Sequence, residues 1–216
     1  MKKLIIFDLD GTLTNTSADI CDNVNKTLVK FGYAPITLEE TKRFVGNGAR
    51  LLVERALKGA KCDNFEDCLN YYNNAYNYCG SPKTYVYDGM IDLMKELKIN
   101  GYKLAVISNK PQAGTDEVYN KFFGSVNVDY VFGQREGIKI KPDKACVEFV
   151  LKEFGIDKKD ALFIGDSDVD ALTAINAEVD GISVLWGYRN KEELIKVGAV
   201  NFASTAEELK NKIMEF

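Results

Sequence analysis

The stretch that decides the fold is residues 4–13, LIIFDLDGTL. Four apolar residues lead directly into Asp8 and Asp10, which are followed by the turn residues Gly11 and Thr12. A short apolar run bounded by turn residues predicts a strand that is buried on both faces, as in a parallel sheet. Because a buried charge is costly unless another group compensates it, we expect a partner for the two carboxylates at the end of this strand.

The rest of the chain alternates between short apolar runs and helical patterns. Further strands are expected over 102–108, 161–165 and 182–186, with a short edge strand over 130–132. Amphipathic helical patterns cover 88–99 and 144–154, and another follows Ser204 or Thr205. This alternation predicts an α/β fold, with a doubly wound, mostly parallel sheet and a Rossmann-like core.

Residues 18–79 break the alternation, because they contain four helical patterns and no strand signal. We expect a helical cap subdomain over 15–82, inserted into a core formed by 1–14 and 83–216. The Tyr- and Asn-rich run at its end, residues 70–79, has a composition that would suit a surface on which nucleic-acid bases stack. Since Tyr72, Tyr76 and Cys79 share one helical face, packing is the better interpretation.

Composition narrows the chemistry that the chain can use. The 216 residues include no histidine and five cysteines without CxxC spacing, which argues against a zinc site or a histidine-activated nucleophile. A net charge of −4 without a basic block argues against a nucleic-acid partner. No apolar run is long enough to span a bilayer, and the aspartates interrupt the apolar start before it resembles a signal peptide. We therefore expect a cytoplasmic protein that uses carboxylates, lysines, hydroxyls or a metal ion.

Four polar motifs fall at the expected ends of strands or starts of helices. They are DLDGT at 8–12, SNK at 108–110, KPDK at 141–144 and GDSDVD at 165–170. In open parallel sheets, ligands bind beyond the carboxyl ends of the strands, so we expect these motifs to be neighbours.

Such a site would concentrate four carboxylates, from Asp8, Asp10, Asp166 and Asp170. Two of them about 4 Å apart repel by roughly 4 kcal/mol at an effective dielectric constant near 20. Oxygen ligands without histidine or thiolate favour Mg²⁺ or Ca²⁺ over zinc. Mg²⁺ commonly binds a carboxylate together with a substrate phosphate, so phosphoryl transfer is the expected reaction.

In order and spacing, these motifs resemble the four signature motifs of the haloacid dehalogenase superfamily of aspartyl phosphatases. The run VGNGARLLVERAL at 45–57 and the later WGY at 186–188 resemble its phosphoglycolate phosphatase branch. The resemblance covers nearly the whole chain. It implies a helical cap, a Mg²⁺ cofactor and a small phosphorylated metabolite as substrate.

The resemblance also implies roles for individual residues. Asp8 would be the nucleophile, and Asp10 the general acid and then the general base. The metal ligands would come from Asp8, Asp10 (through its backbone carbonyl), Asp166 and Asp170, the last of which orients the shell or a bound water. The phosphate would be bound by Gly11, Thr12, Ser108, Asn109 and Lys141.

Several points stay open in the sequence. Asn47 and Arg50 in the GNG region are candidates for substrate specificity, although Arg50 could equally pair with Glu54 one turn later. We assign Asp168 to the cap of its helix, and Lys110 is as consistent with a solvated side chain as with a site residue. The alternative functions are a β-phosphoglucomutase-like phosphomutase, a pyrophosphatase or a nucleotidase. A non-enzymatic role is disfavoured by the intact motifs, and the oligomeric state is open.

Overall fold

A computed structural model of the protein describes residues 2–77 and 80–216, and its centre is a six-stranded sheet. The strand order is β5-β4-β1-β6-β7-β8, and every neighbouring pair is parallel. The strands are β1 (Leu4–Phe7), β4 (Lys103–Pro111), β5 (Tyr130–Gln134), β6 (Ala161–Gly165), β7 (Asp180–Val184) and β8 (Phe202–Ala203). The predicted doubly wound α/β fold is confirmed.

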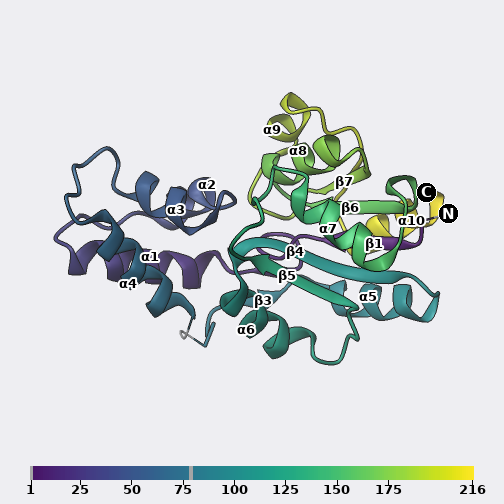
Figure 1. Ribbon diagram of the computed structural model, residues 1–216, viewed down its shortest axis with the longest axis horizontal. Helices are drawn as coiled ribbons and strands as arrows, with labels where there is room; N and C mark the ends of the chain where they lie inside the picture. The colour runs from purple at the N-terminus through teal and green to yellow at the C-terminus, as the bar shows by residue number, and fades with distance from the viewer. Residues whose placement is uncertain (1, 78–79) are drawn as a thin grey trace.

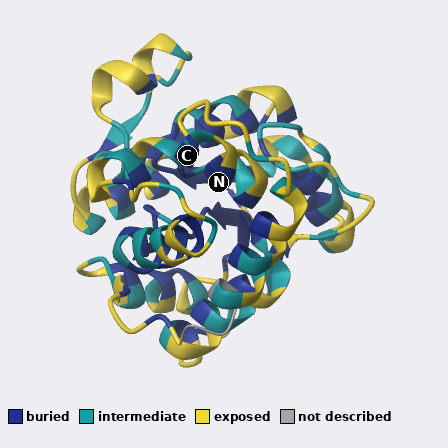
Figure 2. Cartoon of the chain, turned by 90° about the vertical axis from the view of Figure 1, so that its left-hand side faces the viewer, coloured by how far each residue is buried: buried dark blue, intermediate teal, exposed yellow. Residues whose placement is uncertain are grey.

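The central strand β1 buries both of its faces, because successive side chains of a strand point to opposite sides. Ile5 and Phe7 join one hydrophobic cluster, and Leu4 and Ile6 join another. The first cluster lies under α5 (Met90–Ile99), α6 (Gln112–Phe123) and α10 (Ala206–Glu215), and the second under α7 (Ala145–Phe154) and α8 (Asp168–Ala177). Figure 2 shows buried strands at the centre and helices with exposed outer surfaces. The uninterrupted apolar run is therefore the sequence of a strand covered on both faces.

A helical cap lies beside the sheet, at the left of Figure 1. It consists of α1 (Ser17–Lys30), α2 (Leu38–Phe44), α3 (Gly48–Ala56) and α4 (Phe65–Asn77), which share a third hydrophobic cluster. The antiparallel pair β2 (Thr14–Asn15) and β3 (Tyr85–Val86) connects this cap to the core. The four expected helices are present, and the exact boundaries at 15 and 82 stay a prediction.

The packing interpretation of the tyrosine-rich run is confirmed for Tyr72, which is buried in the cluster of the cap. The side chain of Tyr76 and the whole of Cys79 lie outside the described part of the chain. Within the described part, no helix has the length and apolarity needed to cross a membrane.

Three predicted strands differ from those observed, and one of them, the edge strand expected over 130–132, extends to Gln134 as β5. β4 continues to Pro111 instead of ending at residue 108, so Ser108, Asn109 and Lys110 lie on an extended strand. β7 begins at Asp180 and ends at Val184, because its register pairs Asp180 with Leu162 of β6. Partner register is a property of two distant segments, and the local apolar pattern does not contain it.

Candidate active site

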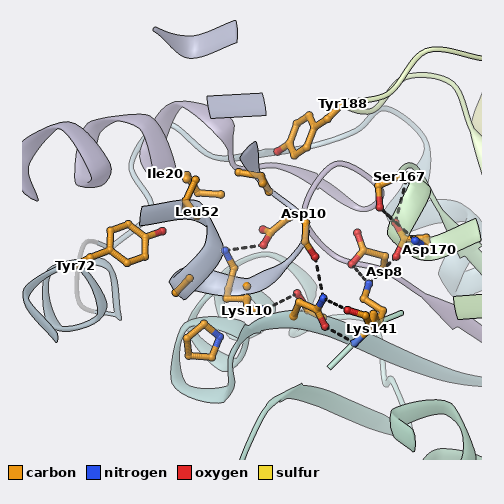
Figure 3. A pocket seen from close by; sticks show the side chains of 17 residues that line it. Asp8, Asp10, Ile20, Leu52, Tyr72, Lys110, Lys141, Ser167, Asp170 and Tyr188 are labelled. Carbon is orange, nitrogen blue, oxygen red and sulfur yellow. Dashed lines mark hydrogen bonds and ion pairs between the residues drawn. The ribbon is translucent and has the colours of Figure 1, made fainter. Parts of the chain in front are cut away.

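The four motifs meet beyond the carboxyl ends of β1, β4 and β6. β1 lies between β4 and β6, so the chain continues on one side of β1 and later returns to the other. Such a switch in strand order leaves a crevice where ligands bind in open α/β sheets. A cavity of about 50 Å³ lies in this crevice, between core and cap (Figure 3). Its core side is lined by Asp8, Asp10, Ser108, Asn109, Lys110, Pro111, Lys141, Ser167, Asp170 and Tyr188, and its cap side by Ile20, Val45, Gly46, Gly48, Ala49, Leu52 and Tyr72.

Lys141 is the cationic partner of two buried carboxylates. Its Nζ donates to Asp8 Oδ1 at 2.6 Å and to Asp170 Oδ1 at 2.7 Å. Burial alone would lower the pKa of Lys141, but the charges of Asp170 and Asp8 outweigh burial and raise this pKa above its ordinary value. The lysine is therefore charged, and it provides part of the compensation expected at the end of β1.

Asp8, Asp166 and Asp170 form a compact acidic cluster. One carboxylate oxygen from each lies within 4.8 Å of the others, and all three residues are buried. Burial, followed by the charge of Asp170, raises the pKa of Asp8 well above its ordinary value and that of Asp166 to about 7. Three carboxylates face a single ammonium group, so ionisation of all three leaves an excess of two negative charges. A buried set of oxygen donors with this excess fits a hard divalent cation such as Mg²⁺.

Asp166 is held in place from two segments. The Thr12 hydroxyl lies 3.0 Å from Asp166 Oδ1 and 3.2 Å from Asp8 Oδ2. The backbone N–H of Tyr188 donates to Asp166 Oδ2 at 2.7 Å. Tyr188 also lines the cavity, which the WGY motif alone did not reveal.

Two glycines let the backbone approach Asp166 closely. Gly11 has a φ of +100°, and a Cβ there would clash with the Asp166 carboxylate. A Cβ at Gly187 would also clash with the Asp166 side chain. These positions exclude a side chain, so the backbone can close around the acidic cluster.

We expect Gly187→Ala to displace Asp166 and to weaken Mg²⁺ binding by at least about tenfold, in line with the usual effect of disturbing the support of a metal ligand. Isothermal titration with Mg²⁺ measures this effect. Gly124→Ala is the matched control, because Gly124 ends a helix and its added Cβ would lie 3.4 Å from the nearest atom. Equal affinities in the two variants would contradict the placement of Asp166.

Asp10 is separate from the acidic cluster, although it lines the same cavity. Its Oδ2 lies 2.9 Å from Lys110 Nζ, and its Oδ1 accepts from Thr16 Oγ1 at 2.7 Å. Figure 3 shows the pair of Asp10 and Lys110. The interpretation of Lys110 as solvated is wrong, since only 3% of its side chain is exposed. Strand periodicity could have found it, because Ser108 and Lys110 are two residues apart on one strand.

Asn109 joins three segments at the edge of the cavity. Its Nδ2 donates to the carbonyl oxygens of Gly46 and Lys141, both at 2.8 Å, and its Oδ1 accepts from the Lys141 N–H at 2.8 Å. Both N–H groups of the Asn109 amide are therefore directed to the backbone, and its role as a phosphate ligand stays a prediction.

The structure does not bring the two candidate specificity residues to the cavity. The Asn47 side chain accepts a hydrogen bond from Arg55. Arg50 forms an exposed, bidentate ion pair with Glu66. Pairing of Arg50 with Glu54 is thus replaced by a contact between helices α3 and α4. The specificity role of Asn47 and Arg50 stays a prediction that this geometry does not support.

Asp168 is not the cap of its helix. Ser167 is the N-cap of α8, since its side chain accepts from the Asp170 N–H, and Asp168 instead pairs with Arg189 at 2.9 Å. Serine is among the preferred N-cap residues, and it forms a capping box with Asp170 three positions later.

Known proteins resemble this chain in sequence and fold. The family model for haloacid dehalogenase-like hydrolases matches residues 5–184. The chain is 35% identical to "Phosphoglycolate phosphatase 1" of Pseudomonas aeruginosa, over 88% of this chain and 72% of that protein. It is 34% identical to a phosphoglycolate phosphatase of Psychrobacter arcticus, over 89% of this chain and 87% of that protein.

A solved structure from Lactobacillus delbrueckii subsp. bulgaricus, provisionally assigned as a phosphoglycolate phosphatase, superimposes with a TM-score of 0.93. It is 33% identical, and the match covers 99% of both chains. The sequence match, the fold and the four converging motifs agree, so the chain belongs to the haloacid dehalogenase-like hydrolase family and is a phosphatase.

Proposed function

We propose that the protein is a Mg²⁺-dependent phosphatase that hydrolyses small phosphate monoesters, such as 2-phosphoglycolate, through an aspartyl-phosphate at Asp8. The observation that carries the proposal is the placement of Asp8 at the end of β1. There it lines the cavity, touches Lys141 and lies two residues from Asp10, whose side chain lines the same cavity. A nucleophile and an acid–base group are thereby combined in one enclosed site.

In the first step, a carboxylate oxygen of Asp8 attacks the phosphorus atom. The new bond from Asp8 to phosphorus forms as the bond from phosphorus to the substrate's alkoxide oxygen breaks, and Asp10 donates a proton to that oxygen. Lys141 lies 2.6 Å from Asp8 and offsets negative charge as the phosphate approaches. The Ser108 side chain also lines the cavity and is a candidate donor to a phosphoryl oxygen.

In the second step, water attacks the aspartyl-phosphate. Asp10 removes a proton from the water as the bond from Asp8 to phosphorus breaks, which releases phosphate and restores both carboxyl groups. Lys110 Nζ lies 2.9 Å from Asp10 Oδ2 and holds this carboxyl group at the cavity in both steps. A phosphate that enters the cavity would compete with Asp10 for this lysine.

Asp8 and Asp166, together with the backbone carbonyl of Asp10, would hold Mg²⁺, and Asp170 would orient the surrounding shell. When bound, the ion supplies positive charge to the phosphoryl oxygens. The fit rests on the buried oxygen donors and on the excess of negative charge in the acidic cluster.

The cavity favours a small leaving group. Its accessible volume is small, about 50 Å³. Ile20, Leu52 and Tyr72 form an apolar wall on the cap side, opposite Asp8 and Asp170 (Figure 3). The named relatives are phosphoglycolate phosphatases, which makes 2-phosphoglycolate the first substrate to test.

The test is phosphate release from a panel containing 2-phosphoglycolate, hexose phosphates, nucleoside monophosphates and pyrophosphate, with Mg²⁺ or with EDTA. We expect the highest kcat/KM for a two- or three-carbon ester, and at least about a 100-fold loss with EDTA, because the metal supplies several kcal/mol of charge stabilisation. Full activity in EDTA would contradict the metal requirement, and a preference for hexose phosphates or nucleotides would contradict the size argument.

We also expect Mg²⁺ to stabilise the fold. At 100 times its dissociation constant, a ligand of the folded state adds about 2.7 kcal/mol, which raises the Tm of a protein of this size by roughly 5–11 °C. Differential scanning fluorimetry with MgCl₂, against NaCl at equal ionic strength, measures the shift. Asp166→Asn should abolish most of the shift, and an equal shift in this variant would contradict the acidic cluster as the binding site.

A further inference from the structure

Arg189 fastens the cap to the core. Its side chain is 10% exposed and reaches from the loop after β7 to the end of α2. Its guanidinium donates to the carbonyl oxygens of Lys42 at 2.8 Å, Val45 at 3.0 Å and Arg43 at 3.3 Å. On the core side, its Nε donates to Asp168 at 2.9 Å. One side chain therefore satisfies acceptors on both sides of the boundary between cap and core.

The carbonyl groups that it contacts are at the C-terminal end of α2. The last carbonyl groups of a helix have no partner within the helix, and a cation is favourable beside them. Here the cation comes from the core and not from the helix itself. Loss of Arg189 would thus leave these groups unpaired unless α2 moved towards solvent.

The segment that follows α2 covers the catalytic cavity. Val45, Gly46 and Gly48 line it, and the Gly46 carbonyl accepts from Asn109 of β4. The cap loop, residues 45–48, is therefore fastened to the core at two points. Its position sets the size and shape of the cavity.

The residue before Arg189, Tyr188, links the acidic cluster to the start of α1. The Tyr188 N–H donates to Asp166, and its hydroxyl accepts from the Thr16 N–H at 3.0 Å, beside the start of α1. Two adjacent residues thus contact Asp166, the base of the cap and the end of α2.

We propose that Arg189 is a positioning residue that holds the cap loop closed over the cavity. Tyr188, the preceding residue, sets the position of Arg189 relative to Asp166. The proposal deepens the proposed function and rests on it for its kinetic part. Arginine suits this task because its planar fork presents several donors at once, which a lysine ammonium on one flexible stem does not reproduce.

The test compares Arg189→Met with wild type by hydrogen–deuterium exchange, without substrate. We expect amides in a peptide spanning 38–49 to exchange about tenfold faster, because opening of the loop breaks local protection, while peptides from β6 and α5 are unchanged. Arg135→Met is the matched control, since Arg135 is also partly buried but its contacts, with Gln112 and Phe132, lie within the core. It should leave exchange over 38–49 unchanged.

The kinetic readout uses 2-phosphoglycolate. A smaller closed fraction raises the apparent dissociation constant in proportion, so Arg189→Met should raise KM about tenfold and change kcat less than threefold. Unchanged exchange over 38–49 would overturn the proposal, as would a fall in kcat and Tm without the change in KM. If wild type hydrolyses no phosphate ester, the exchange experiment still decides the role of Arg189, and only the proposed function fails.

Discussion

Replacement of Asp8 by asparagine is expected to reduce kcat for phosphate release by at least about 10⁴-fold, as in other enzymes that lose a covalent nucleophile. The amide has nearly the same shape as the carboxylate, but it is a weak nucleophile and carries no charge. We expect no phosphorylated protein after rapid quenching of Asp8→Asn with substrate, whereas wild type should gain one phosphoryl group, detected by intact mass spectrometry.

This variant should fold normally. Burial and then the charge of Asp170 raise the pKa of Asp8 in the folded protein. At a pH above the pKa that Asp8 has in the unfolded chain, this raised pKa lowers the free energy of unfolding. An uncharged side chain removes this cost, and the metal-free Tm should not fall by more than a few degrees. Asp92→Asn, in the exposed part of α5, is the control and should retain full activity. Turnover by Asp8→Asn at the wild-type rate would refute the covalent mechanism.

Replacement of Asp10 by asparagine is expected to lower kcat about 10²–10⁴-fold, the usual contribution of a general acid–base group. The effect should depend on the leaving group. With p-nitrophenyl phosphate, the phenolate departs without a proton, so the first step should persist while activation of water fails. We therefore expect one rapid equivalent of p-nitrophenol per enzyme molecule, followed by slow turnover.

Stopped-flow absorbance measures this burst, with Asp92→Asn again as the control. The prediction fails if Asp10→Asn gives no burst and loses kcat equally for p-nitrophenyl and alkyl phosphates. Asp10 would then act in some way other than proton transfer to the leaving group. Wild-type turnover of alkyl phosphates would remove Asp10 from the acid–base role altogether.

The sequence predicted that the polar motifs converge, because its signals are local, and the roles of their residues stay predictions. The apolar run before Asp8 identifies a strand with two buried faces, and a parallel sheet places motifs at the carboxyl ends of its strands close together. Asp8, Lys141, Asp166 and Asp170 meet as expected. The four helices of the cap also follow from local periodicity and capping residues.

What the sequence missed depends on contacts between distant segments. Lys110 is buried and pairs with Asp10, which follows a different strand, and Asp168 pairs with Arg189, which lies in the loop after β7. Arg50 contacts Glu66 and not Glu54, since the packing of α3 against α4 decides its partner. The orientation of the cap over the cavity likewise results from long-range contacts such as those of Arg189.

A crystal structure of the protein with Mg²⁺ and orthovanadate tests the central claim most directly. We predict one Mg²⁺ ion ligated by Asp8 and Asp166, and a vanadium atom beside an Asp8 carboxylate oxygen, with Lys141 contacting the vanadate. Vanadate bound away from Asp8, or no ion between Asp8 and Asp166 at saturating Mg²⁺, would contradict it.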